Sequence, residues 1–433
     1  MLRTRKGTFA GGLARVFGGT VAGQVVVVAC SPLLTRLFTP SDFGALAVFS
    51  AVVTIMGAVC TLRLETAVSL PKTDLRAASV AWTALGIAAV STMIFLIIGI
   101  AASEPIAVAL GAPVLARYWW LLALTMFAIG AGQVLAAWMV RTRRYDVLGR
   151  RVFAQGVGQV LVSLSLGALA WRPVGILLGL FAGRVAGLGG LVSARGLLHQ
   201  RRPRWREVRS VLSRYRRFPL IASWSALLNT AGAQAPLLLI SALYGQVAVG
   251  FVALTVRVLA APAAVIGQSV AQVYLGEAGA ASRARTAELH HFVKTTVRWL
   301  MLVGLPPTII ILLFGYSLFG FLFGPQWAES GHYAQILSVG YLAQFAVSPI
   351  SQTLLLMERQ DIQLRWDILR LLLSAGGPIV CFVVGAPVVV AIVALSASSV
   401  AGFGVLYMYC KRYADLADRE VLSGVRGTDA GIS

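Results

Sequence analysis

Long apolar segments dominate the chain, and this feature limits the folds open to it most strongly. A helix that crosses the hydrocarbon core of a bilayer needs about 20 mostly apolar residues. The 433-residue sequence predicts twelve such helices, over residues 10–37, 43–62, 77–101, 117–140, 152–171, 174–194, 218–243, 247–275, 297–323, 332–357, 364–385 and 387–410. Only 12% of the residues are charged, so a polar surface around a soluble domain is excluded. The sequence therefore predicts an all-α polytopic membrane protein.

The distribution of positive charge predicts the orientation of these helices. The net charge of +21 comes from 37 lysine and arginine residues against 16 acidic ones. Basic residues of membrane proteins concentrate in cytoplasmic loops. If the N-terminus is cytoplasmic, only three basic residues fall on the outer side of the membrane: Arg36, Arg117 and Arg172. The pattern predicts an even number of helices and two cytoplasmic termini.

A basic stretch at the centre of the chain, residues 195–217, carries nine arginines and one glutamate. Clustered arginine can indicate nucleic-acid binding. Here the stretch is tethered between two predicted spans without a separate domain to present it, so we expect no nucleic-acid partner. Hydrophobic residues from Trp205 to Leu212 alternate with the arginines at near-helical spacing. This spacing favours an amphipathic helix on the inner membrane surface.

The basic stretch also divides the chain into four predicted parts. They are an N-terminal six-helix lobe (1–198), a basic cytoplasmic connector (199–217), a C-terminal six-helix lobe (218–410) and a cytoplasmic tail (411–433). Two halves with an even number of helices share one orientation, which fits a parallel duplication. A weak internal similarity aligns residues 34–48 with 240–254 and matches Gly44 with Gly250.

Three arginines fall inside predicted spans: Arg15, Arg184 and Arg257. Ionisable residues in a span are costly and usually face the bundle interior or a water-filled cavity. Arg15 could instead extend to the inner headgroups, and Arg184 lies among small residues that allow close packing. Arg257 lies too deep in its helix to reach the headgroups easily. We therefore expect a cavity role for Arg257 most of all.

Amide side chains inside the predicted spans are further cavity candidates. They include Gln24, Asn229, Gln234 and Gln268. Each could equally form an interhelical hydrogen bond, worth about 0.6 kcal/mol. Together with the arginines they favour an anionic substrate, because guanidinium groups pair bidentately with phosphate and carboxylate.

Three stretches of the sequence carry a family resemblance. Residues 35–72, which begin TRLFTPSDFG, resemble the first hairpin of bacterial Wzx-type oligosaccharide flippases. Residues 217–273 and 323–360 are similar to later parts of the same family, in the same order. This polysaccharide-biosynthesis family belongs to the multidrug/oligosaccharidyl-lipid/polysaccharide exporter superfamily.

The resemblance implies a fold, a substrate and partners. The expected fold is MATE-like, with two six-helix lobes around a central cavity that opens alternately to either side. The expected substrate is an undecaprenyl-pyrophosphate-linked oligosaccharide, moved from the inner to the outer leaflet of the bacterial inner (cytoplasmic) membrane for surface polysaccharide export. Membrane lipids, a polysaccharide polymerase and the export machinery are the expected partners. The resemblance also implies cationic residues that line the cavity, and Arg15 and Arg257, on the corresponding first and eighth helices, are the candidates for them.

The resemblance leaves ion coupling open. The chain departs from the drug-pump branch because it lacks an acidic residue deep in the first helix. Glu65, near the inner end of the second predicted helix, is the nearest candidate for a proton-coupling site.

Other functions remain as alternatives. A multidrug-type or major-facilitator-type transporter of another anionic or amphipathic solute is one, although the usual major-facilitator loop motif is absent after the second helix.

A membrane enzyme would need a large outer loop, and the longest one predicted (102–116) holds a single acid, Glu104. No nucleophile set, metal-ligand spacing or phosphate-binding glycine loop can be assembled, so we expect no catalytic residue, metal or cofactor. A non-catalytic member of a polysaccharide assembly complex is the remaining alternative.

Overall fold

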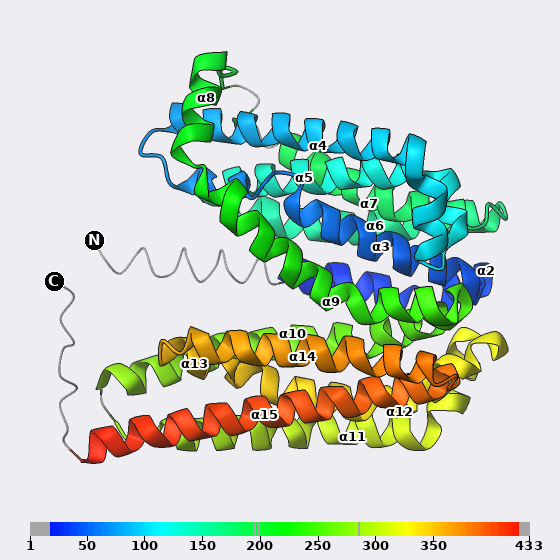
Figure 1. Ribbon diagram of the computed structural model, residues 1–433, viewed down its shortest axis with the longest axis vertical. Coiled ribbons are helices and arrows are strands. Elements are labelled where there is room, and N and C mark those ends of the chain that lie inside the picture. The colour runs from blue at the N-terminus through cyan, green and yellow to red at the C-terminus, as the bar shows by residue number, and fades with distance from the viewer. Residues whose placement is uncertain (1–17, 194–195, 198–199, 285, 424–433) are drawn as a thin grey trace. The chain divides into compact units, whose positions relative to one another are not determined.

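The computed structural model describes residues 18–193, 196–197, 200–284 and 286–423 (Figure 1). Most of the chain in these ranges is helical, and they contain no β-strand. Eleven described helical segments are long and apolar enough to cross a membrane. They are Gly18–Leu37, Pro40–Val59, Asp74–Ala109, Pro113–Arg141, Val174–Val192, Phe218–Tyr244, Gln246–Ala281, Leu289–Phe323, Pro325–Leu356, Gln360–Val383 and Val388–Leu422. The prediction of an all-α polytopic membrane protein is confirmed.

The remaining predicted span, residues 152–171, corresponds to α6 (Tyr145–Ala168). This helix begins seven residues earlier than predicted and carries Asp146, Arg150 and Arg151 in its first two turns. Its composition is therefore more polar than that of the eleven spans. It forms an antiparallel hairpin with α7 (Val174–Ser193), as residue pairs from Gly175–Leu166 to Gly187–Gln155 show.

Three glycines spaced four residues apart on α7 make this hairpin tight. A Cβ atom added at Gly179 would lie 1.9 Å from Oγ of Ser163, and one added at Gly183 would lie 2.6 Å from the carbonyl oxygen of Gln155. Gly187 meets the side chain of Gln155 in the same way. Small residues allow helix backbones to approach closely in a membrane. The glycines thus set the spacing of α6 and α7.

We predict that Gly183→Val lowers the stability of the protein by about 1–3 kcal/mol, the usual cost of overpacking. The added side chain would meet backbone atoms of α6, which cannot rotate away. Thermal unfolding of the purified protein measures the effect. Gly86→Val is the matched control, because a Cβ atom at Gly86 meets no heavy atom within 4 Å. Equal melting temperatures for the two variants would contradict the close-packing argument.

By its contacts the chain divides into two compact units. Unit 1 comprises Met1–Ala253 and Leu322–Trp327, and unit 2 comprises Leu254–Phe321 and Ala328–Ser433. The boundary falls inside α10 (Gln246–Ala284). The preceding helix, α9 (Ser223–Tyr244), packs against α3 (Pro40–Val59) and therefore belongs to unit 1. The division into six-helix lobes by residue number remains a prediction.

The start of α3 contacts the start of α10 within unit 1. The α3 N-terminus has a capping turn, in which Asp42 accepts hydrogen bonds from Thr39 and Thr39 accepts one from the Asp42 backbone. A Cβ atom added at Gly44 would lie 1.8 Å from the carbonyl oxygen of Gln246, and one added at Gly250 would lie 1.8 Å from that of Pro40. The two glycines matched by the internal similarity therefore face one another, and their lack of a side chain permits this approach.

Trp327 fixes the same region of unit 1. Its indole Nε1 donates to the carbonyl oxygen of Thr35 in α2 (Ser31–Leu37), and Nε2 of Gln326 donates to the same oxygen, both at 2.9 Å. The Trp327 ring packs edge-on against Phe43 and Phe251. A fully buried tryptophan thus joins the ends of three helical segments.

The other core of unit 1 lies between α4 (Asp74–Ala109) and α5 (Trp119–Arg141). Small residues of α4, such as Ala77 and Ala81, pack against Val134 and Trp138 of α5. Val211 of α8 (Trp205–Arg214) is buried in the same core. The central basic stretch therefore contains the predicted amphipathic helix, and this helix is docked on α4.

Unit 2 has its own core among α11 (Leu289–Phe323), α12 (Ala328–Val347), α13 (Gln352–Leu356), α14 (Gln360–Val383) and α15 (Val388–Leu422). The indole of Trp366 donates to the carbonyl oxygen of Gly402 at 2.7 Å, which joins α14 to α15.

The last predicted helix ends at residue 410, which is too short. Helix α15 continues to Leu422, because Asp418 accepts hydrogen bonds from the first backbone N–H groups of α11, those of Leu289 and His290. This contact satisfies donors that have no partner inside α11.

Candidate functional site

Two arginines with positive charges close together lie within the α5–α6–α7 part of unit 1. Arg151 lies in the second turn of α6, and Arg184 lies in the middle of α7, where its positive charge acts on the Arg151 guanidinium group. A Cβ atom added at Gly132 would lie 2.6 Å from Nη2 of Arg151, so this guanidinium group reaches α5. The Nε atoms of both arginines are buried and have no hydrogen-bond partner among the described residues. We call these two residues the arginine pair.

The arginine pair has no acidic partner in the part of the chain that the structure describes. A buried charge left without a counter-charge is destabilising by several kcal/mol. Gln155, one helical turn beyond Arg151 on α6, offers a polar group beside Gly187 but no charge. The site is thus electrostatically incomplete, and an anion would complete it.

The geometry suits an anion with several oxygen atoms. A guanidinium group presents its N–H donors in a fixed planar fork that matches carboxylate and phosphate oxygens. Two such groups held by packed helices can neutralise two negative charges. Both arginines are half-buried, and their Nε atoms are fully buried.

Sequence reasoning identifies only one member of the pair. The sequence predicts Arg184 as a cavity residue, whereas it places Arg151 in a cytoplasmic loop because Arg151 follows Arg150 in a basic run. The signal for Arg151 is its spacing from Gln155 and Gln159, which lie four and eight residues further on. This spacing places all three on one face of a helix.

The other predicted cavity residues are distributed over both units. Arg15 lies outside the described residues. Arg257 is half-buried in α10 and belongs to unit 2, so it is not grouped here with Arg184. Gln268 is exposed three helical turns further along α10, on the same face as Arg257.

The predicted cavity amides of unit 1 lie on spans other than those of the arginine pair. Gln24 and Asn229 are exposed, and Gln234 is half-buried. Exposed amides inside a span are unfavourable against lipid and favour a polar or hydrated surface. Their cavity role remains a prediction.

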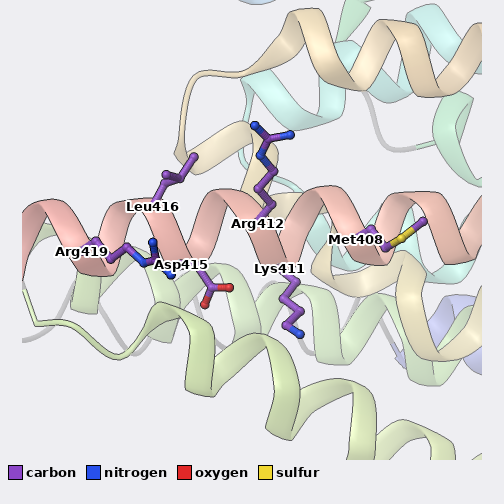
Figure 2. A pocket seen from close by; sticks show the side chains of 6 residues that line it. All are labelled: Met408, Lys411, Arg412, Asp415, Leu416 and Arg419. Atoms are coloured by element: carbon purple, nitrogen blue, oxygen red, sulfur yellow. The ribbon is translucent and has the colours of Figure 1, made fainter.

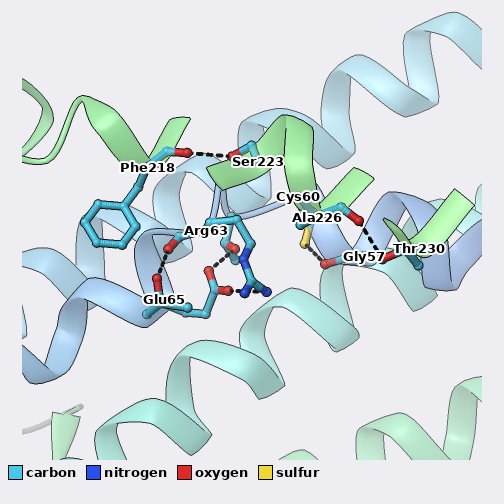
Figure 3. Close-up of polar contacts among 10 residues, drawn as sticks. Gly57, Cys60, Arg63, Glu65, Phe218, Ser223, Ala226 and Thr230 are labelled. Atoms are coloured by element: carbon cyan, nitrogen blue, oxygen red, sulfur yellow. Dashed lines mark hydrogen bonds and ion pairs between the residues drawn. The ribbon is translucent and has the colours of Figure 1, made fainter. Parts of the chain in front are cut away.

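Glu65 is buried, and its carboxylate has two partners in the loop that follows α3 (Figure 3). Thr61 Oγ1 donates to Oε2 at 2.5 Å, and Nη1 of Arg63 lies 3.4 Å from Oε1. Figure 3 also shows Phe218 and Ser223, which begin the α9 segment, near this loop. These contacts give Glu65 a structural role in shaping the loop. Its predicted coupling role is a separate question.

A basic surface pocket on α15 is distinct from the predicted site residues (Figure 2). It is lined by Met408, Lys411, Arg412, Asp415, Leu416 and Arg419. Asp415 contacts Nδ1 of His290 of α11. Nearby on the α13–α14 connection, Arg359 stacks over Tyr413, and its hydrogen bond to Asp361 raises the pKa of the Arg359 guanidinium. The pocket lining itself carries three basic residues against one acid.

We predict that Arg184→Gln raises the melting temperature of the ligand-free protein. The substitution removes a half-buried charge that no acidic residue of the described ranges compensates, and an uncompensated charge of this kind lowers stability. Differential scanning calorimetry measures the change. Arg150→Gln is the matched control, because Arg150 lies one residue from Arg151 on α6 but is exposed. A lower melting temperature for Arg184→Gln would mean that Arg184 is a structural residue.

Comparison with solved structures defines the fold. The chain is similar to an inward-facing multidrug resistance MATE family transporter of the MOP superfamily, with 16% identity, a TM-score of 0.59, and 95% of this chain and 96% of that chain covered. It is also similar to the lipid II flippase MurJ in its inward closed conformation, with 12% identity, a TM-score of 0.66, and 98% and 93% covered. A third similar structure is a mutant of the Vibrio cholerae MATE transporter VcmN, with 12% identity, a TM-score of 0.52, and 96% and 98% covered. These likenesses show a MATE-type polytopic membrane fold and favour it over the major-facilitator architecture.

The sequence itself gives the family. Residues 33–332 match the family described as polysaccharide biosynthesis protein, and the chain belongs to that family. The resemblance found in the three sequence stretches is thereby confirmed. A search of curated proteins finds no match. Family and fold together support a membrane transporter or flippase.

Proposed function

We propose that this protein is a flippase for undecaprenyl-pyrophosphate-linked oligosaccharide repeat units. It moves them from the inner to the outer leaflet of the cytoplasmic membrane by alternating access, for export of surface polysaccharide. Membership of the polysaccharide biosynthesis family, matched over residues 33–332, is the observation that carries this proposal. The likeness in fold to a structure described as a lipid II flippase supports it.

The chemistry of the arginine pair supports a pyrophosphate headgroup. A lipid-linked glycan has a neutral or variable sugar part, a very apolar tail and a constant, negatively charged pyrophosphate link. Two adjacent guanidinium groups without a counter-charge suit that constant group. In this proposal the predicted cavity residues of unit 1, Arg15, Gln24, Asn229 and Gln234, contact the rest of the headgroup. The predicted cavity roles of Arg257 and Gln268 in unit 2 are a separate part of the proposal.

The proposal also includes location and partners. Both termini and the basic connector (199–217) face the cytoplasm, where the lipid-linked unit is made. A polysaccharide polymerase and export machinery act on the unit after it has crossed. The protein itself performs no bond chemistry in this scheme, since transport between leaflets leaves the substrate intact.

A cationic-drug exporter is the alternative that the similar MATE structures raise. Buried arginines without acidic partners oppose it, because they repel cations. A non-transporting member of an assembly complex would not need an uncompensated cationic pair inside its helices.

Flipping by the purified protein in vesicles tests the proposal. The vesicles contain an undecaprenyl-pyrophosphate oligosaccharide, and a membrane-impermeant enzyme that modifies the glycan reports how much has reached the outer leaflet. We expect flipping by the full-length protein and a fall of about tenfold or more for each arginine of the pair replaced by glutamine, since hydrogen bonds to charged groups contribute about 1.5–3 kcal/mol. Arg150→Gln should flip normally. Rates equal to those of protein-free vesicles would refute the flippase proposal.

Glu65 gives a prediction about coupling. If Glu65 carries a coupling proton, Glu65→Gln keeps flipping in the absence of a pH gradient but abolishes its acceleration by one, because glutamine keeps the contact with Thr61 without titrating. We expect this result in vesicles with an imposed pH gradient. Unchanged acceleration would restrict Glu65 to its structural role.

A further inference from the structure

The α8 helix has two chemically different faces. Val211 is buried, and Val208, Leu212 and Tyr215 are half-buried, so one face packs onto unit 1. The opposite face is exposed and basic, and it carries Arg206 and Arg209. Trp205, which is 77% exposed, borders this face at the first residue of the helix. Three more exposed arginines follow at and just beyond the helix end: Arg214, Arg216 and Arg217.

The only acid of this stretch is already neutralised. Glu207 accepts a hydrogen bond from the backbone N–H of Arg204 at 2.8 Å and forms an ion pair with Arg201 at 2.6 Å. Arg202 lies over the ring of Trp82 on α4, which holds the start of the stretch against the unit. Across the described residues, Arg206 and Arg209 form no ion pair. Their charge is available to a partner.

The neighbouring chain shows which partner this surface fits. Directly after Arg216 and Arg217, the exposed side chains change to Leu220, Ile221 and Trp224, each 63–66% exposed. These residues begin the span Phe218–Tyr244 in the same unit. A sharp change from exposed arginine to exposed apolar side chains marks the level where headgroups meet hydrocarbon. Figure 1 shows α8 at the end of the unit from which α9 starts.

We propose that the exposed face of α8 binds the anionic headgroups of membrane phospholipids. Trp205 enters the headgroup layer, and Arg206 and Arg209 pair with lipid phosphates. Exposed tryptophan beside arginine is typical of helices that lie in the membrane interface. An RNA or an acidic protein would also match the charge, but neither accounts for the adjacent apolar side chains. The proposal is independent of which lipid-linked substrate the protein carries.

The environment of Trp205 tests this proposal in the full-length protein. The protein is reconstituted in vesicles that contain brominated phosphatidylglycerol or brominated phosphatidylcholine, whose acyl-chain bromines quench nearby tryptophan. The difference in fluorescence between the unmodified protein and Trp205→Phe isolates Trp205 from the other nine tryptophans. Trp171→Phe is the control, because Trp171 is also exposed (54%) but lies in the turn between α6 and α7, away from the arginine cluster of α8.

We expect phosphatidylglycerol to quench Trp205 more strongly than phosphatidylcholine, and Trp171 to show no such preference. Each substitution Arg206→Gln and Arg209→Gln should weaken the apparent affinity for phosphatidylglycerol about fivefold, and lysine at either position should restore most of it. Raised salt should weaken the preference as well. Equal quenching by both lipids, or a preference that persists in the double glutamine variant, would overturn the proposal. An unchanged melting temperature shows that the variants are folded.

Discussion

The loss of hydration inside a bilayer governs this structure. A polar group that leaves water must find a partner within the protein or remain as a cost. Many polar side chains on the spans follow this rule with local hydrogen bonds, such as Ser and Thr hydroxyls that donate to carbonyl oxygens one turn back. The arginine pair of α6 and α7 breaks the rule. Its burial is a cost that folding alone does not explain, and a bound anion would offset it.

Helix packing places that pair, and small residues control the packing. Glycines four residues apart bring α7 against α6, and this brings Arg184 near Arg151. The same principle joins α3 and α10, where Gly44 meets Gly250. In both places the lack of a glycine side chain lets two helix backbones approach. This approach sets the position of the arginine pair on α6 and α7 and of the capping residues at the start of α3. Positioning of the site is therefore a consequence of packing rather than of a sequence motif.

Much of the fold could be predicted from the sequence, because apolar length and charge distribution report directly on membrane spans. The eleven spans and the amphipathic character of residues 205–212 are of this kind. Three features could not be read in the same way. The sequence places Arg151 in a loop because α6 begins at Tyr145, within a polar segment. Helix α15 extends to Leu422 through a tertiary contact of Asp418 with α11, which no local pattern encodes. Glu65 is recognisable as a buried acid only once Thr61 and Arg63 are seen around it.

Binding of the carrier headgroup is the central claim of this account. The most direct test is the shift in melting temperature caused by undecaprenyl pyrophosphate, undecaprenyl phosphate and undecaprenol, measured for the unmodified protein and for Arg184→Gln. The account predicts that the diphosphate stabilises the unmodified protein most, that undecaprenol has little effect, and that Arg184→Gln loses the difference between the three ligands. Equal stabilisation of both proteins by the diphosphate would contradict a role for the arginine pair in substrate recognition.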